Sequence, residues 1–223
     1  MNRYSRQENI VPAEKLFSAS GNDIVTVIGV GAIGRNVAIQ LAAMGAQKIQ
    51  IIDFDFVEEH NIASQGFMEN DIGLPKVEAV KRTCEAINSD IEVLAVDDRF
   101  KKSIYTGGVV FSCVDSMSVR EFVWNSVKNN VELFIDGRMS AEVCRILSVP
   151  CKSEKEKDFY KSTLFSDEEA HVGSCTAKST IYCSNIAAGL MVSSFTKWLR
   201  SIPTDKDIFL NILMNEISYG EDK

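Results

Sequence analysis

Three glycines, Gly29, Gly31 and Gly34, have the G-x-G-x-x-G spacing of a phosphate-binding loop. They follow an apolar run at 24–29 and precede a helical pattern at 35–44. Glycines at such a junction permit a tight turn and a close approach of the backbone to a phosphate, and the helix N-terminus adds N–H groups. The spacing therefore predicts a nucleotide site, and a tight strand–helix turn without a ligand is the alternative.

An acidic residue ends the next apolar run, at 49–53, and this residue is Asp53. An acid about 20 residues beyond a glycine loop is expected to bind the ribose hydroxyls of a nucleotide. Both NAD and ATP carry these hydroxyls. Asp53 therefore predicts a nucleoside without distinguishing the two.

Charged residues further along favour a triphosphate. Lys76 opens the helical pattern at 75–88, where its charge opposes the helix dipole, and a bound polyphosphate would compensate for this. Asp115 directly follows an expected strand at 109–113, at the edge of the sheet where α/β proteins bind ligands. A carboxylate beside a triphosphate needs a cation between them, so Asp115 is a candidate Mg²⁺ ligand. The alternatives are a solvated lysine and a helix-capping aspartate.

Cys175 is the cysteine whose surroundings best suit a reactive thiol. It follows a charged segment and precedes a helical pattern at 176–199, and a helix N-terminus favours the thiolate form. A buried, inert thiol is the alternative. The six cysteines include no C-x-x-C pair, so no structural zinc is expected.

Alternating elements must position these residues. Four apolar runs predict buried strands, at 24–29, 49–53, 109–113 and 131–136. Helical patterns separate them, and the helix at 118–129 is expected to begin with a capping box of Ser118 and Glu121. This alternation predicts an α/β, Rossmann-like fold with a mostly parallel sheet flanked by helices.

The C-terminal third is expected to add a few antiparallel strands, among them 143–149 and 208–214. Residues 151–174 are charged and lack periodicity, which predicts a flexible surface loop. The helix at 176–199 is expected to bury Ile181, Ile186 and Phe195. We expect one domain over 1–223, with its nucleotide-binding core at 22–136.

Composition excludes several classes of protein. The chain has 223 residues and a net charge of −7, without the clustered basic residues that nucleic-acid binding needs. It contains no run of about 20 apolar residues that would span a membrane, and its first residues do not form an apolar signal segment. We expect a cytoplasmic protein with no nucleic-acid or membrane partner.

Five segments in order resemble the ThiF/MoeB/HesA-type adenylyltransferases, which are similar to the adenylation domain of ubiquitin-activating enzymes. They are "RYSRQ" at 3–7, "GVGAIG" at 29–34, "DFDFVEEHN" at 53–61, "GLPKVEA" at 73–79 and "CVDS" at 113–116. The resemblance covers 3–150 and extends more weakly over 175–200.

The resemblance implies a homodimeric enzyme that uses ATP and Mg²⁺. It implies adenylation of the C-terminal carboxylate, typically of Gly, on a small ubiquitin-like or sulfur-carrier protein or peptide, with release of pyrophosphate. Arg6 would reach the γ-phosphate of the partner subunit's ATP, Asn61 and Lys76 would contact phosphates, and Asp115 would bind Mg²⁺. Cys175 would form a later thioester or persulfide. The other residues expected around the nucleotide are Gly29, Gly31, Ala32, Gly34, Asp53, Asp55, Gln65 and Ser116.

One position departs from the family pattern N-x-x-R-Q. Ser64 stands where the family has an arginine that contacts phosphate. Loss of one such cation is expected to cost about 3–4 kcal/mol at the transition state, by analogy with a lost oxyanion donor. Arg82 or Arg120 is a candidate replacement. Two other functions stay open: a weakened ATP-binding partner protein, and an NAD(P)-dependent oxidoreductase, which would leave Arg6, Lys76 and Asp115 without roles.

Overall fold

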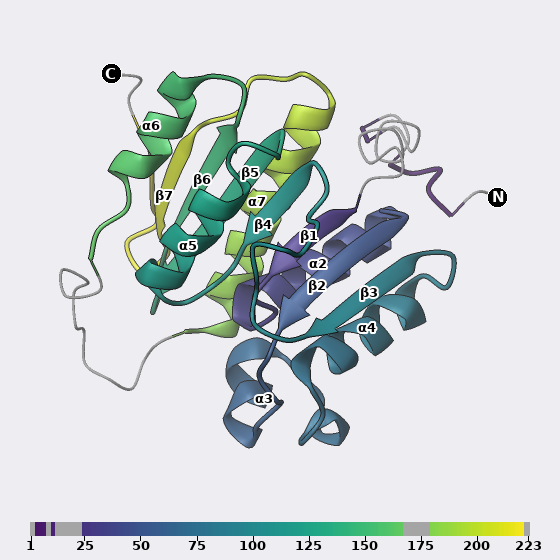
Figure 1. Ribbon diagram of the computed structural model, residues 1–223. Helices are drawn as coiled ribbons and strands as arrows, with labels where there is room; N and C mark the ends of the chain where they lie inside the picture. The colour runs from purple at the N-terminus through teal and green to yellow at the C-terminus, as the bar shows by residue number, and fades with distance from the viewer. Residues whose placement is uncertain (1–2, 8–9, 12–23, 167–178, 221–223) are drawn as a thin grey trace.

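The computed structural model describes residues 3–7, 10–11, 24–166 and 179–220. Within these residues, eight strands form one sheet in the order β3-β2-β1-β4-β5-β6-β7-β8 (Figure 1). Parallel pairing joins the first five: β1 (Val25–Ile28), β2 (Lys48–Asp53), β3 (Glu92–Asp97), β4 (Val109–Ser112) and β5 (Leu133–Ser140). Antiparallel pairing adds β6 (Val143–Pro150), β7 (Asp207–Asn211) and β8 (Glu216–Tyr219). The predicted fold class is confirmed.

Helices cover both faces of this sheet (Figure 1). One face packs against α2 (Ala32–Met44), α4 (Lys76–Ile87) and α7 (Ile181–Leu199). The other packs against α5 (Met117–Val127) and α6 (Glu154–Ser162). The short helix α3 (Glu59–Gln65) and the 3₁₀ helix η1 (Glu69–Asp71) connect β2 to α4. Among the described helices, none has the length and apolarity needed to cross a membrane.

The strand order reverses between β1 and β4. All four residues of β1 and all four of β4 are buried, because helices cover the sheet on both sides. Helix α2 follows β1 on one face of the sheet, and α5 follows β4 on the other face, so the chain leaves the carboxyl ends of these two strands in opposite directions. Ligands of open α/β sheets bind at such a point.

The charged segment predicted as a loop contains a helix, α6, so that prediction was wrong over residues 154–162. Ser153 caps this helix, since its Oγ accepts a hydrogen bond from the Glu156 N–H at 3.4 Å. Tyr160 is its buried anchor and the rest of its surface is mostly charged. One buried residue produces no visible apolar periodicity.

In α7 the expected burial was also partly wrong. Phe195 is buried, but Ile181 and Ile186 are about two-fifths exposed, at 39% and 40%. The buried stripe of the helix is made instead by smaller residues and one methionine: Cys183, Ala187, Ala188 and Met191. Small side chains allow α7 to lie close to α2 and to the sheet.

Candidate nucleotide site

The glycine loop lies between the ends of β1 and β4. Gly29 has a positive φ of 82°, and a Cβ there would lie 2.8 Å from the carbonyl oxygen of Cys113. A Cβ at Gly34 would lie 1.8 Å from the carbonyl oxygen of Gly29. Both contacts are with backbone atoms, so side chains at these positions would displace the loop. Helix α2 begins within this motif, at Ala32, and its N-terminus lies at the carboxyl end of β1.

Asp53 ends β2 beside this loop. Its Oδ2 accepts a hydrogen bond from the Val30 N–H at 2.7 Å, and its Oδ1 accepts one from the Asp55 N–H at 2.9 Å. Burial raises the pKa of the Asp53 carboxyl, and the two N–H donors and the charge of Lys76 partly oppose this effect. Asp53 therefore holds the glycine loop in place as well as lying where a ribose is expected.

Lys76 is a nearly buried cation at the first position of α4. Its residue exposure is 7%, and its Nζ lies 3.0 Å from Asp55 Oδ2. The sequence raised the question of what compensates a lysine at a helix N-terminus. The carboxylate of Asp55 compensates this charge, and its side chain is half-exposed.

Helix α3 contributes an amide at each end. Asn61 is buried, and its Oδ1 caps the helix by accepting a hydrogen bond from the Glu58 N–H at 2.9 Å. Gln65 Oε1 is buried without a hydrogen-bond partner and lies 3.5 Å from where a Cβ of Gly31 would be. A rotation of this amide exchanges its oxygen for two N–H donors. An unpartnered amide beside a glycine cradle fits a phosphate group. Ser64 does not contribute a free group, because its Oγ donates to the His60 carbonyl at 2.9 Å.

Asp115 is exposed in the turn after β4. Ser116 caps α5, since its Oγ accepts from the Val119 N–H at 3.3 Å. The predicted capping box of Ser118 and Glu121 was therefore wrong, and the helix begins earlier. This cap leaves the Asp115 carboxylate unused, and it makes no hydrogen bond or ion pair within the described part of the chain.

Metal binding at Asp115 would depend on the nucleotide. No cluster of three or more His, Cys, Asp or Glu side chains suitable for a metal is found among the described residues. Mg²⁺ is commonly held by one or two carboxylates together with substrate phosphates. A single free carboxylate after the carboxyl end of β4 fits this arrangement and would hold the cation against the phosphate chain.

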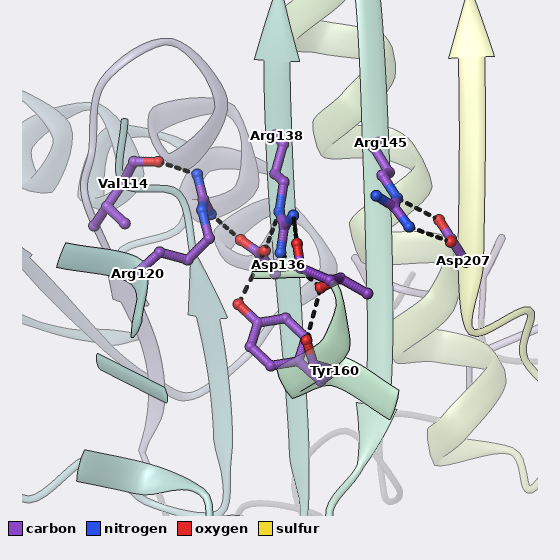
Figure 2. Close-up of polar contacts among 8 residues, drawn as sticks. Val114, Arg120, Asp136, Arg138, Arg145, Tyr160 and Asp207 are labelled. Atoms are coloured by element: carbon purple, nitrogen blue, oxygen red, sulfur yellow. Dashed lines mark hydrogen bonds and ion pairs between the residues drawn. The ribbon is translucent and has the colours of Figure 1, made fainter. Parts of the chain in front are cut away.

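A buried charge network supports the Asp115 turn (Figure 2). Arg120 on α5 donates through Nη2 to the Val114 carbonyl at 2.5 Å and pairs through Nη1 with Asp136 on β5. Asp136 also accepts hydrogen bonds from Arg138 Nε at 2.7 Å and from the Tyr160 hydroxyl at 3.0 Å. Arg120 is thus engaged in holding the turn, which corrects its suggested role as the replacement phosphate cation. The sequence analysis did not identify this network, although Asp136 ends its apolar run as Asp53 does.

Arg6 lies far from the glycine loop of its own chain. The Gln7 side chain donates to the Met44 carbonyl at 2.7 Å, and Asn88 Nδ2 donates to the Tyr4 hydroxyl at 2.8 Å. Residues 3–7 therefore pack at the C-terminal ends of α2 and α4. The 13 residues of α2 separate them from the loop by about 18 Å. Arg6 is exposed at that end.

Cys175 lies outside the described residues, so its role stays a prediction. The described cysteines are free thiols: Cys84, Cys113, Cys144, Cys151 and Cys183. Burial raises the pKa of Cys84 and of Cys151, in each case to about 12. Thiols with such pKa values are poor nucleophiles near neutral pH.

The sheet order and the position of the glycine loop define a Rossmann-like α/β protein, and the model of the ThiF family matches residues 4–218. The chain belongs to the ThiF family. Ubiquitin-like modifier-activating enzyme 5 of Aedes aegypti is 27% identical over 217 residues, which cover 82% of this chain and 52% of that relative. The same-named protein of Xenopus laevis is 27% identical, with 81% and 51% covered. The chain thus spans about half the length of these relatives.

Solved structures share the fold. The crystal structure of E. coli MccB superimposes with a TM-score of 0.78 at 18% identity, covering 99% of this chain and 70% of MccB. The crystal structure of PaaA gives a TM-score of 0.75 at 18% identity, covering 98% of this chain and 72% of PaaA. MccB has also been solved with ATP, with a TM-score of 0.76.

Proposed function

We propose that this protein is an ATP-dependent adenylyltransferase. It activates the C-terminal carboxylate of a small ubiquitin-like or sulfur-carrier protein or peptide, ending in Gly, as an acyl-adenylate. One observation carries the proposal. The strands β2 and β4 are the two neighbours of β1, which leads into the glycine loop. The nearly buried cation of Lys76 comes after β2 and the free carboxylate of Asp115 comes after β4, so the two charges lie on either side of this loop. ThiF family membership and the named relatives, which activate ubiquitin-like modifiers, support it.

The chemistry follows from the charges. A carboxylate oxygen of the carrier attacks the α-phosphorus of ATP, a new C–O–P linkage forms, and the bond to pyrophosphate breaks. Loop N–H groups and Lys76 would stabilise the negative charge that moves onto the leaving group. Mg²⁺, held by Asp115 and the phosphates, would neutralise further charge there.

Pyrophosphate exchange tests this function. We expect labelled pyrophosphate to be incorporated into ATP only when Mg²⁺ and a carrier protein ending in Gly-Gly are present. Lys76→Met should abolish the exchange, because the methionine removes the buried cation and retains its approximate volume. ATP binding without exchange for any such carrier would instead indicate a weakened partner protein. Binding of NAD(H) and not of ATP would contradict the proposal and favour an oxidoreductase.

We propose further that the protein acts as a homodimer, in which Arg6 serves the partner's nucleotide. The distance of about 18 Å along α2 between residues 3–7 and the chain's own loop supports action across a subunit interface. In a two-fold dimer each interface presents the same surface twice.

Mixed dimers test this arrangement. Arg6→Ala and Lys76→Met should each be inactive alone, but a 1:1 co-expressed mixture should regain about one quarter of wild-type exchange, since half the dimers are mixed and each has one intact site. Two differently tagged subunits verify that mixed dimers form. Formation of these dimers without recovery of activity would show that Arg6 serves its own subunit. An Arg6→Ala variant that is active alone would show that Arg6 has no role.

A further inference from the structure

We propose that Arg35 supplies the phosphate-binding cation that the family pattern places at position 64. Arg35 directly follows Gly34 and lies in the first turns of α2, whereas the family arginine would come from α3. The proposal rests on the proposed use of ATP, and it identifies a residue of this chain that the family motifs do not include.

The guanidinium of Arg35 lies at the contact between α2 and the end of α3. Its Nη1 is 3.3 Å from where a Cβ of Gly66 would be, and its Cζ is 5.3 Å from the ring centre of Phe67. In the same contact, Gln65 approaches Gly31 of the glycine loop. Arg35 therefore comes within two residues of Ser64, from the neighbouring helix.

Arg35 is buried over the Phe67 ring, and it has no anionic partner among the described residues. It is 8% exposed, and its Nε is buried without a hydrogen bond. No ion pair or hydrogen bond to its side chain occurs within residues 24–166 or the other described ranges. Asp71 attracts its charge, but the Oδ2 of Asp71 accepts from the Met68 N–H at 3.0 Å and does not pair with the arginine. Burial lowers the pKa of Arg35, and the attraction to Asp71 opposes this effect.

Two buried polar atoms in this part of the structure have no hydrogen-bond partner, Arg35 Nε on α2 and Gln65 Oε1 at the end of α3. Leaving such groups without partners is costly, and a buried cation is the most costly of them. An anion bound at the glycine loop would provide the missing counter-charge. The phosphate chain of ATP is such an anion.

Other cations near the loop are already engaged or face solvent. Arg120 pairs with Asp136, and Arg82 is exposed on α4. Lys76, which pairs with Asp55, already has its own proposed phosphate contact and does not replace the missing arginine. Compared with the family pattern, this chain has Ser64 in place of the arginine on α3 and has Arg35 on the neighbouring helix α2. The site therefore keeps the same number of positive charges.

Comparing ATP with adenosine tests the role directly. We expect Arg35→Met to weaken ATP binding at least tenfold in calorimetry while adenosine, which lacks phosphates, binds as to the wild type. Adding Ser64→Arg to Arg35→Met should restore most of the ATP affinity. Arg200→Met is the matched control, because Arg200 follows the end of α7, about 27 Å of helix from Ile181, which contacts the Gly66 region.

Equal ATP affinity in Arg35→Met and wild type would overturn the proposal, as would equal weakening of ATP and adenosine, which indicates a structural role only. If the wild type itself binds no ATP, the result contradicts the proposed adenylyltransferase function. This outcome is distinct from a contradiction of the Arg35 role, which requires a wild type that binds ATP. Should Arg35→Met not fold, Arg35→Lys carries the test. A lower ratio of ATP to adenosine affinity then supports the role, because lysine lacks the planar donor fork, and an unchanged ratio overturns it.

Discussion

Replacing Asp136 by asparagine is expected to lower the free energy of unfolding by about 3–5 kcal/mol, the usual cost of breaking a buried ion pair from one side. The Asp136 side chain is 0% exposed and those of Arg120 and Arg138 are 3% and 11% exposed. Asparagine retains the shape but removes the charge. Both arginines would then be left with uncompensated charge in a largely buried region.

Urea unfolding followed by tryptophan fluorescence measures this effect. Trp124 is a suitable reporter, because it is buried and its ring centre lies 4.5 Å from that of Tyr160, a member of the same network. Asp207→Asn is the control in the neighbouring pair with Arg145 (Figure 2). That arginine is 34% exposed, so we expect a loss of only about 1 kcal/mol. Equal losses in the two variants would show that burial does not determine the strength of this network.

Replacing Asp115 by asparagine is expected to reduce pyrophosphate exchange by about 10²–10³-fold without changing the stability of the protein. The carboxylate is exposed and unpaired within the described residues, so the fold does not depend on it. If it binds Mg²⁺ at the phosphate chain, the neutral amide loses most of the attraction for the cation. The expected effect therefore falls on catalysis alone.

Exchange rates measured over a series of Mg²⁺ concentrations give the size of this loss. Raising Mg²⁺ should recover part of the activity, because the amide oxygen remains a weak ligand. Asp90→Asn is the matched control, since Asp90 is also an exposed carboxylate but lies near Asn88, at the end of α4 remote from the loop. Activity of Asp115→Asn close to that of the wild type would remove Asp115 from the proposed metal site.

Local patterns predicted most of the sheet. Parallel strands that are buried on both faces are continuous apolar runs, so β1, β2, β4 and β5 were recognised from the sequence. The edge strand β3 was not, because only Val93 of its residues is fully buried. Helix α6 was missed for the same reason, since one buried residue, Tyr160, does not produce an apolar periodicity in the sequence.

For the candidate site too, some features were predictable from the sequence and others were not. The sequence predicted the glycine loop, Asp53, Lys76 and Asp115 as site residues. Each lies at the end of an expected strand or helix, and such ends can be recognised in short segments of sequence. The ion pair of Lys76 with Asp55 and the capping of α5 by Ser116 could not be predicted from the sequence, because both depend on the backbone geometry of the turns.

Arg35 illustrates what only the tertiary structure decided. In the sequence it is an ordinary polar residue in a helix, and nothing nearby indicates that it lies buried against Gly66. Asp136 likewise acquires its partners from α5, β5 and α6. Apolar periodicity and glycine spacing are local and can be read from the chain. Whether a charge is paired depends on distances between elements remote in sequence, and these distances exist only after the helices have packed on the sheet.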